Sequence, residues 1–164
     1  MQVSQRDQAA PPANVLARQL AGFLRYAWSR SDSDFTREVA EQDLTFSQLK
    51  TLLLLGEHAE ALSVKDVAEM LGISLPAASR AVDSLVRRGL AERAEDPADR
   101  RMKQVRTSRK GDRLVERLVV ARISSFERLL EGFTTTERRK LGDALDEIVA
   151  RPEIARLCPR GGRR

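Results

Sequence analysis

The residues with the most evident chemistry are basic side chains gathered between residues 74 and 113. This segment holds 11 Lys and Arg against 6 Asp and Glu, so its net charge of +5 equals that of the whole chain. Guanidinium and ammonium groups bind the phosphates of nucleic acids, and a basic segment of this kind is typical of proteins that do so. The concentration of charge predicts a phosphate-contacting segment, with a solvated basic surface as the alternative.

A tight turn lies at the start of this segment, between two short helices with apolar stripes. Gly72 breaks the chain between a helix that begins after Ser63 and one that begins after Ser74. Such a helix–turn–helix can place its second helix in the major groove, and that helix has small or polar residues on the face opposite its apolar stripe. An ordinary αα-hairpin is the alternative. We predict that the second helix contacts DNA through Ser74, Leu75, Ala77, Ser79, Arg80 and Arg87.

A polar loop with a proline follows the second helix. Leu90–Ala94 and Met102–Thr107 have the length and composition of two paired strands, which makes residues 95–101 the tip of a hairpin. Arginine on a thin projecting loop can enter a minor groove, whereas the alternative is a solvated tip with an internal ion pair. We predict that the hairpin contacts DNA through Arg100, Arg101 and Lys103, and that Asp99 positions one of these arginines.

Other chemistry finds little support in the sequence. The chain has one histidine, His58, and one cysteine, Cys158, and it has none of the glycine-rich phosphate loops, nucleophile elbows or zinc-binding helices of common enzymes. We therefore expect no catalysis, no metal and no cofactor. The single cysteine fits a reducing cytoplasm, and the polar residues 1–13 and the short longest apolar run, Leu52–Leu55, predict neither a signal peptide nor a membrane span.

The elements that must position these residues are mostly helices. Hydrophobic residues make up 41% of the chain but aromatic ones only 4%, so the core must consist of Leu, Val, Ile and Ala. Periodicity and caps predict a helix from about Asn14 that fades at Ser29–Asp34, and further helices after Thr45, Ser63, Ser74, Ser108 and Thr134. Gly56 is expected to end the helix that begins after Thr45. The helix after Ser108 should run to about Glu131, and the helix after Thr134 should end at Pro152. The predicted fold class is mainly α with a small β-hairpin wing.

Three runs of the sequence resemble the MarR family of winged helix-turn-helix regulators. Residues 63–74 (SVKDVAEMLGIS) look like the first half of its helix-turn-helix, residues 79–90 (SRAVDSLVRRGL) resemble its recognition helix, and residues 96–101 (DPADRR) are similar to its wing. The resemblance covers about residues 14–150. It implies an obligate homodimer on double-stranded DNA, with Asp99 and Arg101 matching the Asp-x-Arg of the wing. It also implies, for many members, release of DNA by a small phenolic or aromatic ligand or by an oxidant.

The sequence departs from this family pattern at three positions. Leu75 stands where a polar or basic residue would be expected to touch DNA, so it either contacts a thymine methyl group or packs. Thr107 replaces a larger apolar residue of the second wing strand. Cys158 lies far from the N-terminal helix, where some members sense oxidants, which argues against such sensing here.

The apolar residues outside the winged lobe predict how the chain is organised. The first helix and the last two carry more apolar surface than one small lobe can cover, which a two-fold dimer would bury. We expect a disordered arm over 1–12, dimerisation helices over 13–40 and 108–150, the winged lobe over 45–107 and a basic tail over 151–164. Arg25, Tyr26, Trp28 and Phe46 are candidates for an effector pocket. The alternative is that the three aromatic residues belong to the core or an interface and that Arg25 is an exposed arginine.

Together these features predict a sequence-specific double-stranded DNA-binding transcriptional regulator. Repression from a palindromic operator, by a homodimer, is the expected mode. The alternative is a helical protein–protein or RNA interaction module with a basic face.

Overall fold

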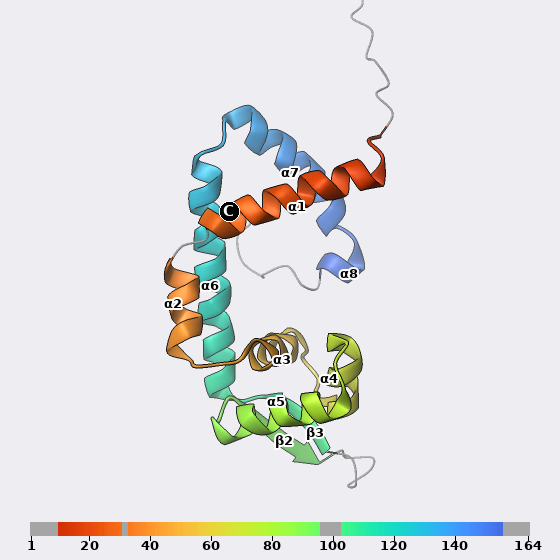
Figure 1. The fold of residues 1–164 in the computed structure, drawn as a ribbon, viewed down its shortest axis with the longest axis vertical. Coiled ribbons are helices and arrows are strands. Elements are labelled where there is room, and N and C mark those ends of the chain that lie inside the picture. Colours follow the sequence, from red (N-terminus) through yellow and green to blue (C-terminus); the bar gives the residue numbers. More distant parts are fainter. Residues whose placement is uncertain (1–9, 31–32, 96–102, 156–164) are drawn as a thin grey trace, which may run out of the picture.

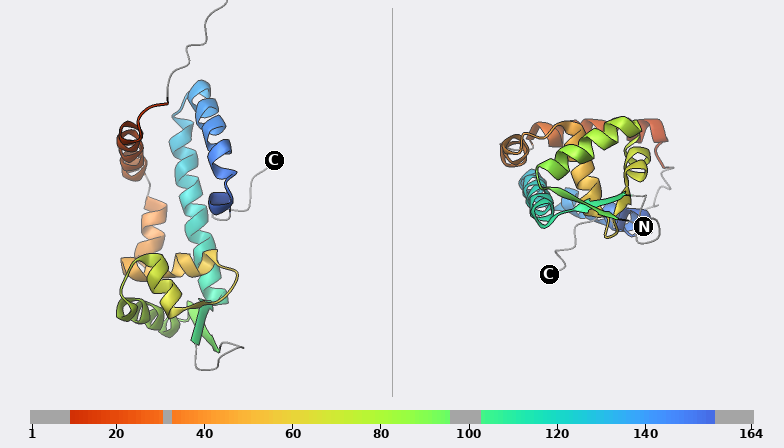
Figure 2. Two further views of the ribbon diagram at one scale, coloured as in Figure 1. Left: turned by 90° about the vertical axis from the view of Figure 1, so that its right-hand side faces the viewer. Right: turned by 90° about the horizontal axis from the view of Figure 1, so that it is seen from below.

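The computed structural model describes residues 10–30, 33–95 and 103–155, and within them it shows a winged lobe at one end of a long helix and further helices at the other (Figure 1). Helix α6 runs the length of the molecule and connects the two ends (Figure 2). In chain order the elements are α1 (Ala13–Arg30), α2 (Ser33–Glu41), α3 (Phe46–Glu57), β1 (Leu62–Ser63), α4 (Val64–Leu71), α5 (Leu75–Arg87), β2 (Ala91–Glu95), β3 (Lys103–Thr107), α6 (Arg109–Glu131), α7 (Thr135–Val149) and α8 (Pro152–Ala155).

The winged lobe consists of α3, α4, α5 and a small antiparallel sheet. The predicted hairpin is confirmed, because β2 and β3 pair from Ala91 opposite Thr107 to Glu95 opposite Lys103. A third strand, β1, pairs with the other edge of β3 and was not predicted, since two residues are too short to show alternation. The core of the lobe is built from aliphatic side chains, among them Leu52, Leu55, Val67, Val82, Leu85, Val105 and Leu114, all of them almost completely buried.

Side-chain caps set most of the helix starts that the sequence predicts. Thr45, Ser63 and Thr134 each form a capping box, in which the cap side chain accepts from the backbone N–H three residues on and that residue's side chain accepts in return. Ser74 and Ser108 cap α5 and α6 through their hydroxyl oxygens. These local hydrogen bonds explain why the boundaries could be placed without tertiary information.

The expected end of α3 at Gly56 is wrong, because the helix continues to Glu57 and is capped by His58. Gly56 lies opposite the side chain of Val115 on α6, and a Cβ at this position would be 3.0 Å from its methyl groups. The glycine therefore permits close packing of α3 against α6.

A separate helix, α2, begins at Ser33, within the stretch where the sequence predicted helix to fade. It packs on α6 through contacts that its own sequence does not reveal. Arg117 of α6 donates from Nε to the Glu38 carboxylate at 2.6 Å, and the Arg122 guanidinium carbon lies 3.7 Å from the centre of the Phe35 ring.

Another short helix, α8, lies where the basic tail was expected to begin.

The other end of α6 carries α1 and α7, and much of their apolar surface is uncovered. Val15, Leu16, Leu20 and Leu24 of α1 are between 42% and 54% exposed, and Leu145 and Ile148 of α7 are each 45% exposed. Phe23 and Phe133 meet edge to face with their ring centres 6.3 Å apart. This end of the protomer leaves an apolar surface facing solvent.

Candidate nucleic-acid interface

The turn between α4 and α5 has the geometry that the sequence predicts. Gly72 has a positive φ of 62°, a conformation that glycine adopts at little cost, and its N–H donates to the carbonyls of Ala68 and Glu69. Ser74 then caps α5, and Pro76 occupies its first turn, where the lack of an N–H is tolerated. These residues hold α5 at a fixed angle to α4.

Helix α5 has one buried and one exposed face. Ala78, Ala81, Val82 and Leu85 pack into the core of the lobe, and the buried Ser84 accepts a hydrogen bond from the Gln48 side chain at 2.9 Å. Of the predicted DNA contacts on this helix, Ser74, Leu75, Arg80 and Arg87 are exposed, whereas Ala77 and Ser79 are half-buried. The exposed face therefore carries Ser74 and Leu75 at the N-terminus and arginines further along.

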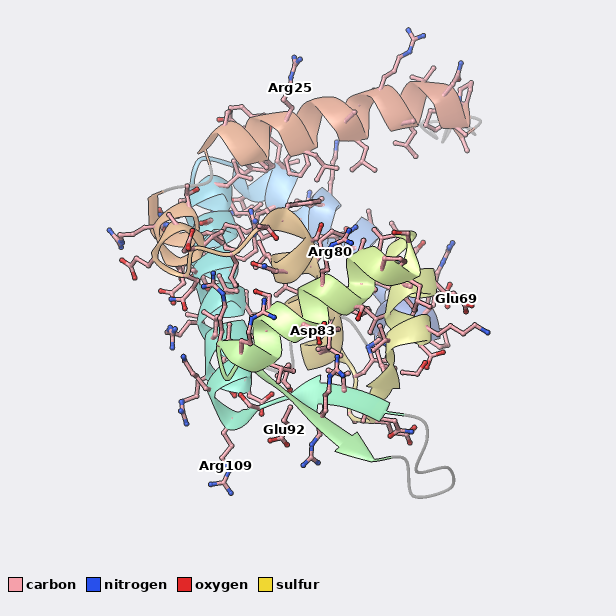
Figure 3. The ribbon with its side chains drawn as sticks, turned by 60° about the horizontal axis from the view of Figure 1, so that its bottom comes forward. Arg25, Glu69, Arg80, Asp83, Glu92 and Arg109 are labelled. Carbon is pink, nitrogen blue, oxygen red and sulfur yellow. The ribbon has the colours of Figure 1, made fainter. Side chains whose placement is uncertain are left out.

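Arg80 lies beside the N-terminus of α3. The two elements border a shallow cavity of about 260 Å³ lined by Thr45, Ser47, Gln48, Ala77, Arg80 and Ala81. No ion pair of Arg80 is found among the described residues, and Figure 3 shows the side chain leaving the exposed side of α5. A guanidinium next to the positive end of a helix makes this surface attractive to an anion such as a DNA phosphate.

Ion pairs connect α5 to the wing strands and brace the strands to each other. Asp83 of α5 forms an ion pair with Arg93 of β2, and Glu92 of β2 accepts from Arg106 directly opposite on β3 at 2.7 Å. Asp99, Arg100 and Arg101 lie outside the described residues. The backbone of Lys103 is placed at the start of β3, but its side chain is not described. The base of the wing is thus defined, and the predicted contacts at its tip stay predictions.

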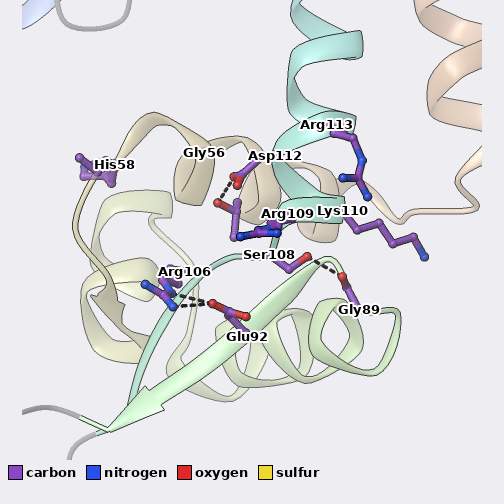
Figure 4. Close-up of a pocket in the computed structure, with 12 residues that line it drawn as sticks. Gly56, His58, Gly89, Glu92, Arg106, Ser108, Arg109, Lys110, Asp112 and Arg113 are labelled. Carbon is purple, nitrogen blue, oxygen red and sulfur yellow. Dashed lines mark hydrogen bonds and ion pairs between the residues drawn. The ribbon is translucent and has the colours of Figure 1, made fainter.

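The end of α5 is held by hydrogen bonds that the sequence did not predict. Ser108 donates to the Gly89 carbonyl at 2.6 Å (Figure 4). Lys110 donates to the Arg88 carbonyl at 3.0 Å. The Arg88 guanidinium donates in turn to the carbonyls of Gln42 and Asp43 at 3.0 and 2.9 Å. These bonds fasten the start of α6 and the α2–α3 connection to the end of α5.

A wide cleft of about 800 Å³ lies beside this junction (Figure 4). Its walls include Arg106, Arg109, Lys110 and Arg113, which account for part of the positive charge of residues 74–113. The charge count indicated that these cations cluster along the chain, but only the fold shows that they gather where β3 meets α6.

The four candidate effector residues do not line the apolar cavity that the structure contains between α2, α3 and α6. That cavity, of about 390 Å³, lies between α2, α3 and α6 and is lined by Phe35, Leu53, Glu57, Leu118, Val119, Arg122, Ile123 and Phe126. Burial lowers the pKa of the Arg122 guanidinium. No short motif joins these residues, so the sequence offered no signal for them.

The candidate residues themselves occupy other positions. Figure 3 shows Arg25 pointing away from the molecule on the outer side of α1. Tyr26 is 49% exposed, and Phe46, the first residue of α3, is 73% exposed with the Lys50 ammonium 5.7 Å from its ring centre. The side chain of Trp28 is not described. Their role in binding an effector stays a prediction.

Neither a metal centre nor a membrane segment is found in the part of the chain that the structure describes. No group of three or more His, Cys, Asp or Glu residues is arranged to hold a metal ion there. None of the helices over residues 10–30, 33–95 and 103–155 combines the length and apolar character needed to cross a bilayer.

Comparison with known proteins agrees with this geometry. Residues 42–102 match the model of the MarR family. The uncharacterized HTH-type transcriptional regulator YfiV of Bacillus subtilis is 28% identical over 103 residues, which are 63% of this chain and 64% of that protein's length. The structure of RV1404 from Mycobacterium tuberculosis is 25% identical and superposes with a TM-score of 0.72, covering 87% of this chain and 95% of the other.

A Staphylococcus aureus MepR variant bound to an oligodeoxyribonucleotide has the same fold. It superposes with a TM-score of 0.59 at 21% identity, over 85% of this chain and 97% of the other. MepR has also been solved bound to ethidium bromide. The match to the MarR family model covers residues 42–102 of the winged lobe, and the likeness to solved structures extends the shared fold to the helices beyond that lobe.

Proposed function

We propose that this protein is a transcriptional regulator that binds double-stranded DNA sequence-specifically through α5 and the wing. The observation that carries this proposal is the exposure of Leu75, Arg80 and Arg87 on a helix whose other face is buried in a rigid core. Short side chains near the helix start allow close approach to base edges, and arginines further along can bond bases or phosphates. The MepR structure with DNA supports this reading by likeness of fold.

The functional unit in this proposal is a homodimer. The uncovered apolar residues of α1 and α7 supply a surface that a second copy would bury, with residues 13–40 and 108–150 forming the dimerisation region and residues 45–107 the DNA-binding lobe. A two-fold dimer places two recognition helices about 34 Å apart, one turn of DNA. The operator is then palindromic, and occupancy of a promoter by such a dimer would repress transcription.

Release of DNA by a small aromatic or phenolic effector belongs to the same proposal. The apolar cavity between α2, α3 and α6 supports it, because α2 leads into the connection that Arg88 holds against the recognition helix. A ligand that moved α2 would thereby act on α5.

A salt titration tests the main proposal against a protein or RNA interaction module with a basic face. Affinity for a random duplex and for a duplex selected from a random pool is measured at several salt concentrations. A DNA regulator shows a steep fall of log affinity with log salt and a specificity ratio on the order of 10³ or more. A shallow slope with no preference for any duplex would instead favour the interaction module.

Two arginine variants separate base recognition from phosphate contact. Arg80→Ala is expected to cost about 1–3 kcal/mol mainly on the selected duplex, and Arg101→Ala is expected to weaken selected and random duplexes alike. Equal losses on both duplexes for Arg80→Ala would remove Arg80 from base recognition.

A further inference from the structure

We propose that Leu75 determines operator specificity by packing against the C5 methyl group of a thymine in the major groove. The inference rests on the proposed DNA-binding function and adds to it a single side chain and a single chemical group. It predicts that each half-site contains one thymine whose methyl group, apart from its hydrogen bonds, contributes to affinity.

The position of Leu75 favours contact with DNA over packing in the core. It is the first residue of α5, and it is 53% exposed even though the core of the same lobe buries Leu52, Leu55 and Leu85. A single exposed leucine is common on protein surfaces and needs no explanation by itself. This one lies at the end of the recognition helix that would enter the groove first.

The first turn of α5 is poorly suited to binding a phosphate. Pro76 has no N–H, and the N–H of Ala77 donates to the Ser74 hydroxyl oxygen at 3.4 Å. Two of the first three backbone donors of the helix are thus absent or already used, so the charge of a phosphate would find few partners here. The surface offered by Leu75, Pro76 and Ala77 is apolar instead.

The chemistry of the groove identifies what such a surface can recognise. Among the base edges in the major groove, the C5 methyl group of thymine is the apolar one, and leucine has no donor or acceptor for the others. Ser79 and Arg80 lie one helical turn further on, about 6 Å along the helix axis, and can hydrogen-bond neighbouring base pairs. Leu75 would therefore select thymine next to positions read by hydrogen bonds.

Replacement of thymine by deoxyuridine removes the methyl group and leaves base pairing unchanged. The probe is the duplex selected by the wild-type protein, with each symmetry-related pair of thymines replaced in turn and affinity measured by fluorescence anisotropy at fixed salt. One pair is expected to weaken binding by about fourfold per half-site, about 16-fold in all, because burial of one such group contributes about 0.8 kcal/mol. Leu75→Ala should lose a similar factor on the intact duplex and show no further loss with deoxyuridine.

Met70→Ala is the matched control, since Met70 is also an exposed apolar residue, 50% accessible, but lies on α4. It should keep the sensitivity to deoxyuridine. The inference fails, with the proposed function intact, if the wild type prefers its selected duplex yet no thymine pair shows a methyl effect, or if Leu75→Ala retains that effect. A wild type without preference for any duplex would overturn the proposed function and the inference with it.

Discussion

The winged lobe and the opposite end of the molecule use apolar residues in different ways. In the lobe, α3 and α5 bury Leu52, Leu55, Val82 and Leu85 almost completely within one protomer. At the opposite end, α7 has no buried residue, and α1 exposes a row of aliphatic side chains spaced three to four residues apart. Both regions have helical periodicity in sequence. Periodicity alone therefore does not show whether the apolar face of a helix is buried within its own chain or left for an interface.

Polar contacts differ between the two regions as well. The lobe is fastened by hydrogen bonds between residues far apart in the sequence, such as those of Arg88 with the α2–α3 connection and of Gln48 with Ser84. By contrast, the side-chain hydrogen bonds that α7 makes with the rest of the described chain are those of the local capping box of Thr134 and Glu137 at its start. The lobe is thus held together by contacts within its own chain, whereas the other end leaves apolar side chains that would be buried only in the proposed dimer.

The largest effect is expected on dimerisation, from a charge introduced on the exposed apolar face of α1. Leu20→Asp is expected to raise the dimer dissociation constant about 1000-fold, because two unpaired carboxylates would have to be buried at a two-fold interface. Sedimentation velocity over a range of protein concentrations measures this change.

Leu75→Asp is the control for Leu20→Asp, since Leu75 and Leu20 have nearly equal exposure, 53% and 54%. It should leave the dimer intact while abolishing DNA binding. A dimer that survives Leu20→Asp unchanged would mean that this face of α1 is not part of the interface.

The next largest effect is expected from a methyl group added at Gly111, in the first turn of α6 where it packs on the lobe. A Cβ at Gly111 would lie 2.0 Å from the Leu90 carbonyl oxygen, which is backbone and cannot simply rotate away. Gly111→Ala is therefore expected to lower the free energy of unfolding by about 3 kcal/mol, as measured by urea denaturation.

Gly142→Ala is the matched change at the opposite end, where a Cβ would meet nothing within 4 Å in the protomer. It should stabilise α7 by up to about 1 kcal/mol through helix propensity. Similar responses of the two variants would contradict the contrast in packing between the two regions.

Loss of the Arg88 hydrogen bonds at the end of α5 should have a smaller effect on the free energy of unfolding. Arg88→Met removes the hydrogen bonds to Gln42 and Asp43 and should lower the free energy of unfolding by about 1 kcal/mol, because the site is partly solvated. Its neighbour Arg87, which is exposed and a predicted DNA contact, gives the converse: Arg87→Met should weaken DNA binding with little change in stability. An exchange of these two outcomes would show that the roles are assigned to the wrong arginine.

The smallest effect is expected from the cap of α7. Hydrogen bonds from the Thr134 backbone and hydroxyl lower the pKa of the Glu137 carboxyl. Because the folded-state pKa is lowered, the stabilisation is present above the ordinary carboxyl pKa and is lost as the pH falls through the lowered value. The melting temperature of Glu137→Gln should lie slightly below that of the wild type at neutral pH and coincide with it in acid. A constant difference over the whole pH range would exclude the charge as its source.

Local signals explain which parts of this fold could be predicted from sequence. Ser74, Pro76 and Gly89 mark the ends of α5 through caps and turn conformations that involve only near neighbours, and the hairpin strands follow from their own composition. By contrast, β1 exists only because β3 lies beside it, and α2 is held by Glu38 and Phe35 against a helix some 80 residues away in sequence. The cavity near Arg122 arises in the same way, from three helices brought together by the core.

The length of α6 has a mechanical consequence. Its 23 residues span about 34 Å, and its start is bonded to the end of α5 through Ser108 and Lys110. If the far end were fixed in a dimer, a tilt of about 10° there would displace the near end by about 6 Å, nearly two base-pair steps. In the proposed DNA-binding dimer, a modest rotation between subunits would thus move the two copies of α5 out of register with the DNA grooves without any change inside either lobe.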